Sequence, residues 1–432
     1  MLKIIEKNIN QEIKKIQNRL SFDNHEEENK VKKILENVKT KGDKALFEYT
    51  EAFDKVKLKA IEVDFLEIEE AHISIKDDIL ATIRVAIKNV ADFHFKQLPS
   101  SWGKTVFDKS LLAWRYSPLQ KVGIYVPGGT AAYPSSVIMN TVPAKIAGVP
   151  EIVMVTPPDK TGQVPALTLA VAKEVGIEKI YKIGGAHAVA ALAYGTKTIS
   201  PVDKIVGPGN LYVTLAKKLV LGTCGIDKLA GPSDVLVLAD ETANPAYIAA
   251  DLLAQAEHDI FASSILITTS KEVAEKVNKE ILVQMKKLSR KQIIQQSLKE
   301  NSIIIIAKNE KEMIKFSDKI APEHLEIMTK DPLGITEKVK NAGAIFLGDY
   351  APTSLGDYLL GPNHVLPTSG NARFDSPLSV HDFIKTSSIS QVHSSLLKAY
   401  APDVEKFALL EGLDAHANAV KIRMSSLKNL RS

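Results

Sequence analysis

The sequence has a single cysteine, Cys224, and little net charge for its 432 residues. One cysteine cannot form an intramolecular disulfide or a cysteine-rich zinc site, so a metal would need histidine, carboxylate and amide ligands. The net charge is +4 and the lysines alternate with acids, which argues against nucleic acid and against a polybasic membrane contact. Polar residues interrupt every apolar run near the N-terminus, and no secretory or transmembrane segment is apparent. We therefore expect a cytoplasmic protein.

The remaining composition is typical of a globular protein, with 45% hydrophobic and 25% charged residues. From residue 122 onward, short apolar segments alternate with helical patterns, which predicts parallel sheets covered on both faces. Strands of a first series are predicted at 122–126, 152–155, 179–183 and 204–206. Strands of a second series are predicted at 235–239, 264–268, 303–306 and 344–347. We expect two tandem doubly wound, Rossmann-like α/β units with helical N- and C-terminal extensions, rather than a (β/α) barrel, because the strand spacing is irregular.

This pattern divides the chain into five predicted segments. They are an N-terminal helical arm (1–24), a mostly helical segment packing with the second α/β unit (25–121), a first, nucleotide-side α/β domain (122–233), a second α/β domain carrying metal and catalytic residues (234–378) and a C-terminal helical tail making a dimer contact (379–432). A glycine- and proline-rich stretch at 348–377 is too long for a plain connector and is a candidate functional loop. In the tail, Gly412 is predicted to end one helix and Asp414 to cap the next.

The segment DLLAQAEHD at 251–259 is rich in alanine and leucine and predicts a helix. Gln255 and His258 are three residues apart, so their side chains would leave one helix face as neighbours. An imidazole nitrogen and an amide oxygen one turn apart form half of a metal site. The alternative is an ordinary surface helix with a polar face.

Three further groups could take part in chemistry. Glu323 and His324 could act as an acid/base pair, although neighbours in a regular strand point to opposite faces and the alternative is a solvated turn. Other candidates are Asp357 and His364 in the long loop, and Glu411 and His416 around the helix break. Together, Gln255, His258, Asp357 and His416 would supply two nitrogens and two oxygens, a suitable zinc set with positions left open for substrate.

Several glycine-bearing turns follow the predicted strands. They are Pro127-Gly128-Gly129, Gly184-Gly185, Gly207-Pro208-Gly209-Asn210 and Ala230-Gly231-Pro232-Ser233. Glycines at the carboxyl ends of parallel strands let a phosphate or nucleotide approach helix N-termini. The alternative is that they are tight βα turns, since none has the G-x-G-x-x-G pattern.

Seven motifs make the sequence similar to the histidinol dehydrogenase family, in the order in which that family has them. They are VGIYVPGGTAAYPSSVIMN, GPGN, AGPSDVLVLAD, DLLAQAEHD, APEHLE, GDYLLGPNHVLPT and GLDAHANAV. The resemblance implies an NAD-dependent enzyme of histidine biosynthesis that oxidises L-histidinol through L-histidinal to L-histidine. It also implies one zinc ion per subunit and a homodimer in which the partner supplies the fourth zinc ligand.

The resemblance also implies roles for individual residues. The zinc ligands would be Gln255, His258, Asp357 and His416, and the catalytic pair Glu323 and His324. Substrate would contact Ser233, His364 and Glu411 as well as Gln255, His258, His324, Asp357 and His416. NAD would contact Tyr125, His187 and Asn210. The sequence departs from the family at His187, where glutamine is common, and at Asp234, where glutamate is usual.

The residue types suit this chemistry. An imidazole and an amine on the substrate are good ligands for zinc, His324 can remove the alcohol proton, and Glu323 can activate water for the aldehyde step. A zinc hydrolase would use similar ligands but would need neither the glycine turns nor a nucleotide. An aldehyde dehydrogenase of the thiol type would need Cys224 as nucleophile, and we interpret that residue as a packing cysteine.

Overall fold

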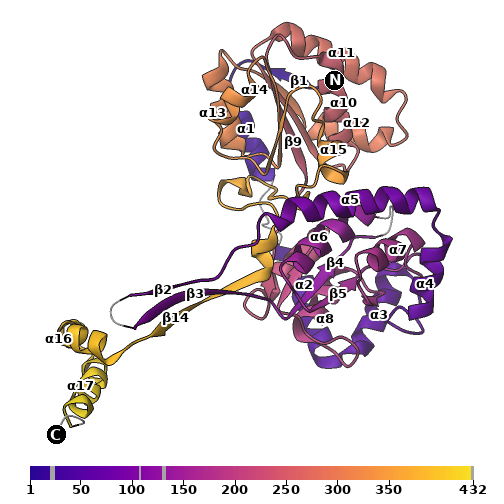
Figure 1. Cartoon of the computed structure of the whole chain (residues 1–432). Coiled ribbons are helices and arrows are strands. Elements are labelled where there is room, and N and C mark those ends of the chain that lie inside the picture. The colour runs from indigo at the N-terminus through magenta and orange to yellow at the C-terminus, as the bar shows by residue number, and fades with distance from the viewer. Residues whose placement is uncertain (20–24, 107–108, 129–132, 430–432) are drawn as a thin grey trace. The chain divides into compact units, whose positions relative to one another are not determined.

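The computed structural model describes residues 1–19, 25–106, 109–128 and 133–429 (Figure 1). The chain forms two compact units, each built from two stretches of sequence. Unit 1 comprises Met1–Gln97 and Leu119–Phe383, and unit 2 comprises Leu98–Pro118 and Ile384–Ser432. No helix in these described ranges is long and apolar enough to cross a membrane.

Unit 1 contains a first sheet of five parallel strands in the order β6-β5-β4-β7-β8. Its strands are β4 (Lys121–Tyr125), β5 (Glu151–Val155), β6 (Lys179–Tyr181), β7 (Lys204–Val206) and β8 (Gly225–Ile226). Its helices are α6 (Pro134–Ile146), α7 (Ala166–Glu174), α8 (Gly185–Tyr194) and α9 (Leu211–Val220). The four predicted strands are confirmed, and the direction of strand addition reverses between β4 and β7. Such a switch point leaves a crevice at the carboxyl ends of the two strands.

Four helices before this sheet cover its own helices. They are α2 (His25–Lys41), α3 (Asp43–Asp54), α4 (Phe65–Ser74) and α5 (Asp77–Phe95). α2 packs on α8 and α9, α3 on α8, α4 on α7, and α5 on α6. The apolar face of α2, including Val31 and Val38, shares a buried cluster with Leu192 of α8. This corrects in part the prediction that 25–121 packs with the second α/β unit, because these helices pack on the helices of the first sheet. α5 also contacts the loop of the predicted second domain, where the Asn89 amide donates to the Leu359 carbonyl at 2.8 Å.

The second sheet of unit 1 has six parallel strands in the order β1-β11-β10-β9-β12-β13. Its strands are β1 (Lys3–Ile5), β9 (Asp234–Ala239), β10 (Ser263–Thr268), β11 (Ile303–Ile306), β12 (His324–Met328) and β13 (Ala344–Leu347). Its helices are α1 (Ile9–Arg19), α10 (Pro245–Ala256), α11 (Lys271–Met285), α12 (Lys291–Glu300), α13 (Glu310–Ile320), α14 (Pro332–Thr336) and α15 (Thr353–Tyr358). Separate apolar clusters bury alternate residues of β9, Val235 and Val237 in one and Leu236 and Leu238 in the other, so both faces are covered as predicted.

The structure adds β1 and β12 to the four strands of the predicted second series. β1 extends the sheet at its edge, so the N-terminal arm is a strand followed by a helix, and residues 20–24 of the predicted arm lie outside the described residues. β12 lies between β9 and β13. The long loop after β13 contains α15 and a 3₁₀ turn, Asn371–Arg373.

Unit 2 is an antiparallel ribbon followed by two helices (Figure 1). The strands β2 (Trp102–Thr105), β3 (Leu111–Pro118) and β14 (Ile384–Gln391) pair in the order β14-β3-β2. The helices are α16 (Ser394–Leu410) and α17 (Asp414–Asn429), which pack on each other. The predicted helix break is confirmed, with Gly412 at φ +73°, but the prediction that 379–432 is helical fails at β14. That strand, IKTSSISQ, is mostly exposed and has no buried apolar face.

Candidate active site

Ser233 links two of the predicted site residues. Its hydroxyl donates to Glu323 Oε2 at 2.5 Å and accepts from the Gln255 amide nitrogen at 2.7 Å. Ser233 precedes β9 and Glu323 precedes β12, and these strands are parallel neighbours, so their amino ends lie side by side. Gln255 lies in the last turn of α10, which returns from the carboxyl end of β9 to this edge. The candidate site is therefore built at the amino ends of β9 and β12.

The turn before β12 allows Glu323 and His324 to serve one site. Ala321 ends α13 in the left-handed conformation with φ +52°, and the strand begins only at His324. Glu323 Oε2 and His324 Nδ1 lie 3.7 Å apart, and each residue is 6% exposed. The irregular turn thus meets the geometric condition for an acid/base pair, and burial excludes the solvated-turn alternative.

Asp234 holds both members of this pair. Its backbone N–H donates to Glu323 Oε2 at 3.1 Å, and its carboxyl Oδ1 accepts from the Glu323 backbone N–H at 3.0 Å. Burial, together with the neighbouring Glu323 charge, raises the pKa of Asp234 to about 7. Burial also raises the pKa of Glu323. The sequence marked Asp234 only as a departure from the family, and its one local signal was a carboxyl group at the start of an apolar strand.

The protonation of the His324 ring follows from its contacts. Nδ1 lies 2.9 Å from the Asp234 carbonyl oxygen, which can only accept, so Nδ1 carries a proton and donates it. Nε2 lies 3.8 Å from Asp357 Oδ1. Burial acts to lower the pKa of His324, but the charges of Glu323 and Asp357 outweigh it and raise the pKa. Nε2 is therefore the basic nitrogen of the pair.

Three predicted metal ligands, Gln255, His258 and Asp357, belong to unit 1. Gln255 uses its amide nitrogen on Ser233, which leaves its amide oxygen available. His258 is exposed and lies beyond the end of α10 at Ala256, so the helix predicted over 251–259 is shorter, but the His258 N–H still bonds the Gln255 carbonyl at 3.2 Å. Asp357 is on α15 and interacts electrostatically with His258. An amide oxygen, an imidazole and a carboxylate fit the ligand preferences of zinc.

The remaining substrate and metal candidates are placed as follows. His364 Nδ1 lies 3.1 Å from the Asp357 carbonyl oxygen and donates to it, which leaves Nε2 unprotonated. Glu411 and His416 are exposed and belong to unit 2, at the end of α16 and on α17. Within the described ranges, no three His, Cys, Asp or Glu side chains of this chain form a group that could hold a metal.

The residues predicted to bind a nucleotide lie at the carboxyl edge of the first sheet, whereas the acid/base pair described above lies at the amino edge of the second. Tyr125 ends β4, and its hydroxyl accepts from the Gly185 N–H at the start of α8 at 2.9 Å. Gly207 has φ +112°, and a Cβ there would lie 2.1 Å from the Tyr125 carbonyl oxygen, so only glycine fits. Asn210 caps α9 by accepting from the Val213 N–H at 3.2 Å. Tyr125 and the N-termini of α8 and α9 therefore lie at the carboxyl edge of the first sheet.

His187 is buried in α8, 1% exposed. The Thr50 hydroxyl donates to the Leu46 carbonyl, so His187 Nε2–H donates to Thr50 Oγ1 at 3.3 Å and Nδ1 is left as an acceptor. Among the described residues, no group bonds Nδ1. Burial lowers the pKa of His187 to about 3, which keeps the ring neutral.

Two of the glycine turns are explained by packing alone. A Cβ at Gly128 or Gly184 would lie 2.7 or 2.6 Å from Pro157, the residue on which both turns pack. The tight-turn alternative therefore accounts for these two glycines, while Gly129 lies outside the described residues. Cys224 is also a packing residue, because it is buried in the core of the first sheet and burial raises the pKa of its thiol to about 11.

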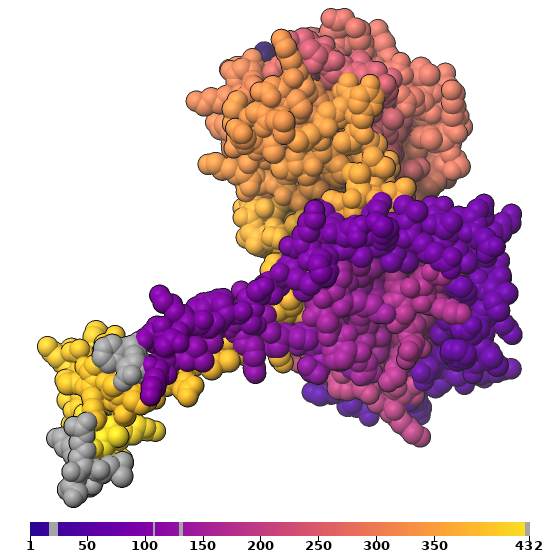
Figure 2. Space-filling model, in the orientation of Figure 1, coloured from indigo at the N-terminus to yellow at the C-terminus, as the bar shows by residue number. Residues whose placement is uncertain are grey.

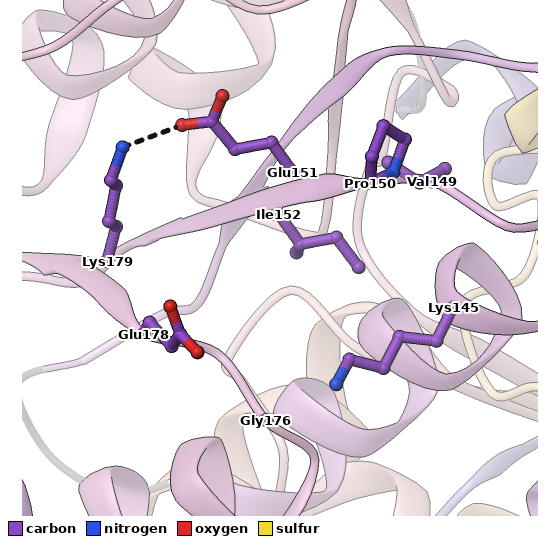
Figure 3. Close-up of a pocket in the computed structure, with 8 residues that line it drawn as sticks. All are labelled: Lys145, Val149, Pro150, Glu151, Ile152, Gly176, Glu178 and Lys179. Atoms are coloured by element: carbon purple, nitrogen blue, oxygen red, sulfur yellow. Dashed lines mark hydrogen bonds and ion pairs between the residues drawn. The ribbon is translucent and has the colours of Figure 1, made fainter.

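A cavity of about 370 Å³ opens elsewhere in unit 1 (Figure 3). Lys145, Glu151, Gly176 and Lys179 line it, and Lys179 pairs with Glu151 at 2.9 Å. Glu151 and Lys179 begin β5 and β6, so the cavity is at the amino edge of the first sheet, opposite Tyr125. It contains none of the predicted site residues.

Comparison with known proteins identifies the relatives of this chain. A family model described as histidinol dehydrogenase matches residues 17–424. The chain is 53% identical over 393 residues to a histidinol dehydrogenase of Clostridium acetobutylicum, covering 91% of each, and 50% identical over 398 residues to that of Bacillus subtilis, covering 92% and 93%. A crystal structure of histidinol dehydrogenase from Elizabethkingia anophelis matches with a TM-score of 0.94 at 38% identity, covering 99% of both chains.

Proposed function

Because the chain belongs to the histidinol dehydrogenase family, which uses NAD and zinc to oxidise L-histidinol through L-histidinal to L-histidine, we propose roles for its own residues in that reaction. The hydrogen-bonded series Gln255–Ser233–Glu323 beside His324 carries the proposal. It joins a metal-ligand candidate, a substrate contact and an acid/base pair at one sheet edge. The first two would bind and orient substrate while the pair moves protons.

Gln255, His258 and Asp357 would hold zinc through an amide oxygen, an imidazole nitrogen and a carboxylate. Bound zinc would supply an anchor for the imidazole and amine of histidinol. The Ser233 hydroxyl fixes the Gln255 amide with its oxygen turned away from Ser233, because the nitrogen is the donor at 2.7 Å. This orientation is what a metal ligand at Gln255 requires.

His324 would act as base in the alcohol oxidation. Nε2 takes the hydroxyl proton as the carbon-bound hydrogen leaves with its electron pair for NAD. The Asp234 carbonyl holds the Nδ1–H, and the Glu323 and Asp357 charges stabilise the imidazolium that forms. His364, with Nε2 unprotonated, would contact the substrate from the long loop.

Glu323 would act as base in the aldehyde oxidation. Its Oε2 is held by the Ser233 hydroxyl and the Asp234 N–H, so its carboxylate is oriented before water arrives. It takes a proton from water as the oxygen adds to the aldehyde, and the hydrate then gives a second hydride to NAD. The raised pKa of Glu323 makes it a stronger base than a solvated carboxylate.

Replacing Glu323 and His324 separately tests these assignments. Glu323→Gln should slow aldehyde oxidation more than alcohol oxidation, so histidinal should remain bound or accumulate. His324→Asn should lower kcat for alcohol oxidation by about 10²–10⁴. Reduced-nicotinamide absorbance in single-turnover reactions, started with histidinol or with histidinal, measures both steps. Equal losses in the two steps for Glu323→Gln would contradict its role.

We also propose that Tyr125, His187 and Asn210 contact NAD at the carboxyl edge of the first sheet. The N-termini of α8 and α9 begin there, and their positive ends suit a pyrophosphate. The neutral His187 ring offers Nδ1 as an acceptor at the position where the family commonly has glutamine. This makes 122–233 the nucleotide-side part of the chain and 234–378 the part carrying metal and catalytic residues.

The remaining proposal is a cytoplasmic homodimer with shared active sites. Unit 2 includes the helices α16 and α17, which are yellow in Figure 2. Phe407 and Leu410 of α16 are 69% and 75% exposed, beside the exposed Glu411. Exposed large apolar residues next to polar ones are typical of an interface. The tail of one chain would supply Glu411 and His416 to the site of its partner, with His416 as fourth zinc ligand.

Mixed dimers test the sharing. His258→Asn and His416→Asn homodimers should each be inactive, whereas their heterodimer has both lesions in one site and an intact second site. Recovery toward half of the wild-type activity supports sharing. Purified heterodimers without activity would mean that each chain builds its own site. His381→Asn, an exposed histidine outside the site, is the matched control and should leave activity unchanged.

A further inference from the structure

A second pair of buried carboxyl groups, Asp251 and Glu326, lies in the second sheet and has no role in the steps above. Glu326 is on β12 and is 0% exposed, and Asp251 is on α10 and is 8% exposed. Glu326 Oε1 accepts from the backbone N–H of Thr353 at 3.1 Å. The Glu326 carboxyl also hydrogen-bonds the Asp251 carboxyl. The Glu326 carboxyl therefore contacts α10 through Asp251 and the first residue of α15, Thr353.

This contact requires a proton between the two carboxyl groups, because two carboxylates offer only acceptors. Burial raises the pKa of both groups, that of Asp251 to about 6 and that of Glu326 well above its ordinary range. Among the described residues, no N–H group donates to Glu326 Oε2. We assign the shared proton to the Glu326 carboxyl, which donates it to the Asp251 carboxyl and accepts through Oε1 from the Thr353 N–H.

Each of the three hydrogen-bonded residues lies close in sequence to a proposed site residue, on the same face of the same helix or strand. Asp251 precedes Gln255 by four residues on α10, and Thr353 precedes Asp357 by four residues on α15. Residues four apart share a helix face. Glu326 follows His324 by two residues on β12, and residues two apart share a sheet face. The contact therefore joins the three elements that present Gln255, His324 and Asp357.

We propose that Glu326 is a positioning residue: its acid group joins α10 to α15 through Asp251 and the Thr353 N–H, and so sets the spacing of the metal ligands. The inference rests on the proposed zinc roles of Gln255, His258 and Asp357. An apolar side chain would fill this buried strand position without the desolvation cost of a carboxyl group. The acid at this position therefore serves the alignment of the three elements rather than the packing of the sheet.

Four variants separate the hydrogen bonds from the bulk of the side chains. Glu326→Gln keeps a donor toward Asp251 and an acceptor toward Thr353, whereas Glu326→Met keeps only the size. Thr353→Pro removes the N–H alone, because position 353 is the first of its helix and Pro352 at ψ 150° tolerates a following proline. Thr353→Ala keeps the N–H and is its control.

Zinc affinity of the full-length dimer, measured by competition with a chromogenic chelator, is the readout. Glu326→Met and Thr353→Pro should weaken zinc binding by about 10–100-fold, as other groups that orient metal ligands do. Glu326→Gln and Thr353→Ala should bind zinc as the wild type does. Should Glu326→Met fail to fold, Thr353→Pro decides alone.

A stability control distinguishes positioning from a merely structural role. Asn278→Leu removes two buried hydrogen bonds to Leu2 in the same sheet, at 2.8 and 3.1 Å, away from the site. It should lower the thermal midpoint of unfolding but keep zinc affinity. The proposal is overturned if Glu326→Met and Thr353→Pro bind zinc normally, if Glu326→Gln is as weak as Glu326→Met, or if Asn278→Leu loses zinc equally.

The same titration on Asp357→Asn keeps the two levels of proposal apart. If Asp357→Asn retains zinc, the proposed metal site itself is wrong. If Asp357→Asn loses zinc while Glu326→Met and Thr353→Pro retain it, the metal site holds and only the positioning role of Glu326 fails.

Discussion

The two sheets of unit 1 present opposite edges to their proposed ligands. In the first sheet, Tyr125 and Asn210 lie at the carboxyl ends of β4 and β7, where helices begin. In the second, Ser233 and His324 lie at the amino ends of β9 and β12, where α10 ends. Helix N-termini have partial positive charge and helix C-termini partial negative charge. The first edge therefore suits a pyrophosphate and the second a metal cation, although both sheets are doubly wound.

Removing the metal should have the largest effect and should act on the second edge alone. Chelation, or Asp357→Asn, should abolish turnover because substrate loses its anchor, and added zinc should restore turnover only to the chelated wild type. NAD binding, measured by protein fluorescence or calorimetry, should be unchanged. A parallel loss of NAD affinity would show that the two edges are not independent.

Gly207→Ala should weaken NAD binding at the first sheet and leave zinc binding at the second unchanged. A Cβ at Gly207 would overlap the Tyr125 carbonyl oxygen at 2.1 Å, so the turn leading to Asn210 must shift. Overpacking of this kind costs about 1–3 kcal/mol, and NAD affinity should fall by tenfold or more. Zinc content should stay at the wild-type level. As control, alanine at Gly222 (φ +100°), which has open space around its Cβ, should strain the backbone without changing NAD affinity.

His187→Gln should have a moderate effect that depends on pH. The pKa of His187 is about 3 in the folded chain, below its ordinary value, so the unfolded chain binds the extra proton as pH falls below about 6.5. Folding stability must therefore decrease toward acid pH. At pH 5 this costs about 2 kcal/mol, since each pKa unit is worth about 1.36 kcal/mol. Urea unfolding between pH 5 and 8 measures this. The free energy of unfolding should fall less toward pH 5 for His187→Gln than for the wild type, and an equal fall in both would contradict a neutral buried His187 ring.

Cys224→Ser should have the smallest effect. The thiol lies in the core of the first sheet with a pKa of about 11, so it supplies no thiolate at neutral pH. Both oxidation steps should keep near wild-type rates. Selective loss of the aldehyde step would revive a thiol mechanism.

The sequence predicted those parts of the fold whose burial is uniform. The strands at 152–155 and 264–268 are mostly apolar and buried throughout because both faces of their sheets are covered. β14 was missed because its pairing with β3 is a long-range contact between exposed residues, and neither segment shows an apolar alternation. Helical periodicity marked the buried face of α2, but periodicity cannot say which element covers that face.

The same limit applies to the site. Motifs predicted the chemical groups Glu323, His324 and Gln255, because motifs record residue types and order. The roles of Asp234 and Glu326 depend on hydrogen bonds between elements some 27 to 90 residues apart in the chain, such as the 3.0 Å bond from the Glu323 N–H to Asp234. Glu326 did leave one signal, an acid within the otherwise apolar segment after His324. A carboxyl group in a buried strand implies a hydrogen-bonding partner.

The antiparallel ribbon of unit 2 can be completed only near the end of protein synthesis. β3 pairs with β14 from Leu111 opposite Gln391 to Pro118 opposite Ile384. β3 is synthesised early and β14 late, so this pairing cannot form until the C-terminal part of the chain has been made. Contacts of such high sequence separation form late, because loop closure precedes them. A nascent chain that lacks β14 therefore also lacks α16 and α17, the helices that carry Glu411 and His416. In the proposed homodimer only finished chains could exchange these tails, so the topology would delay the association of subunits until synthesis ends.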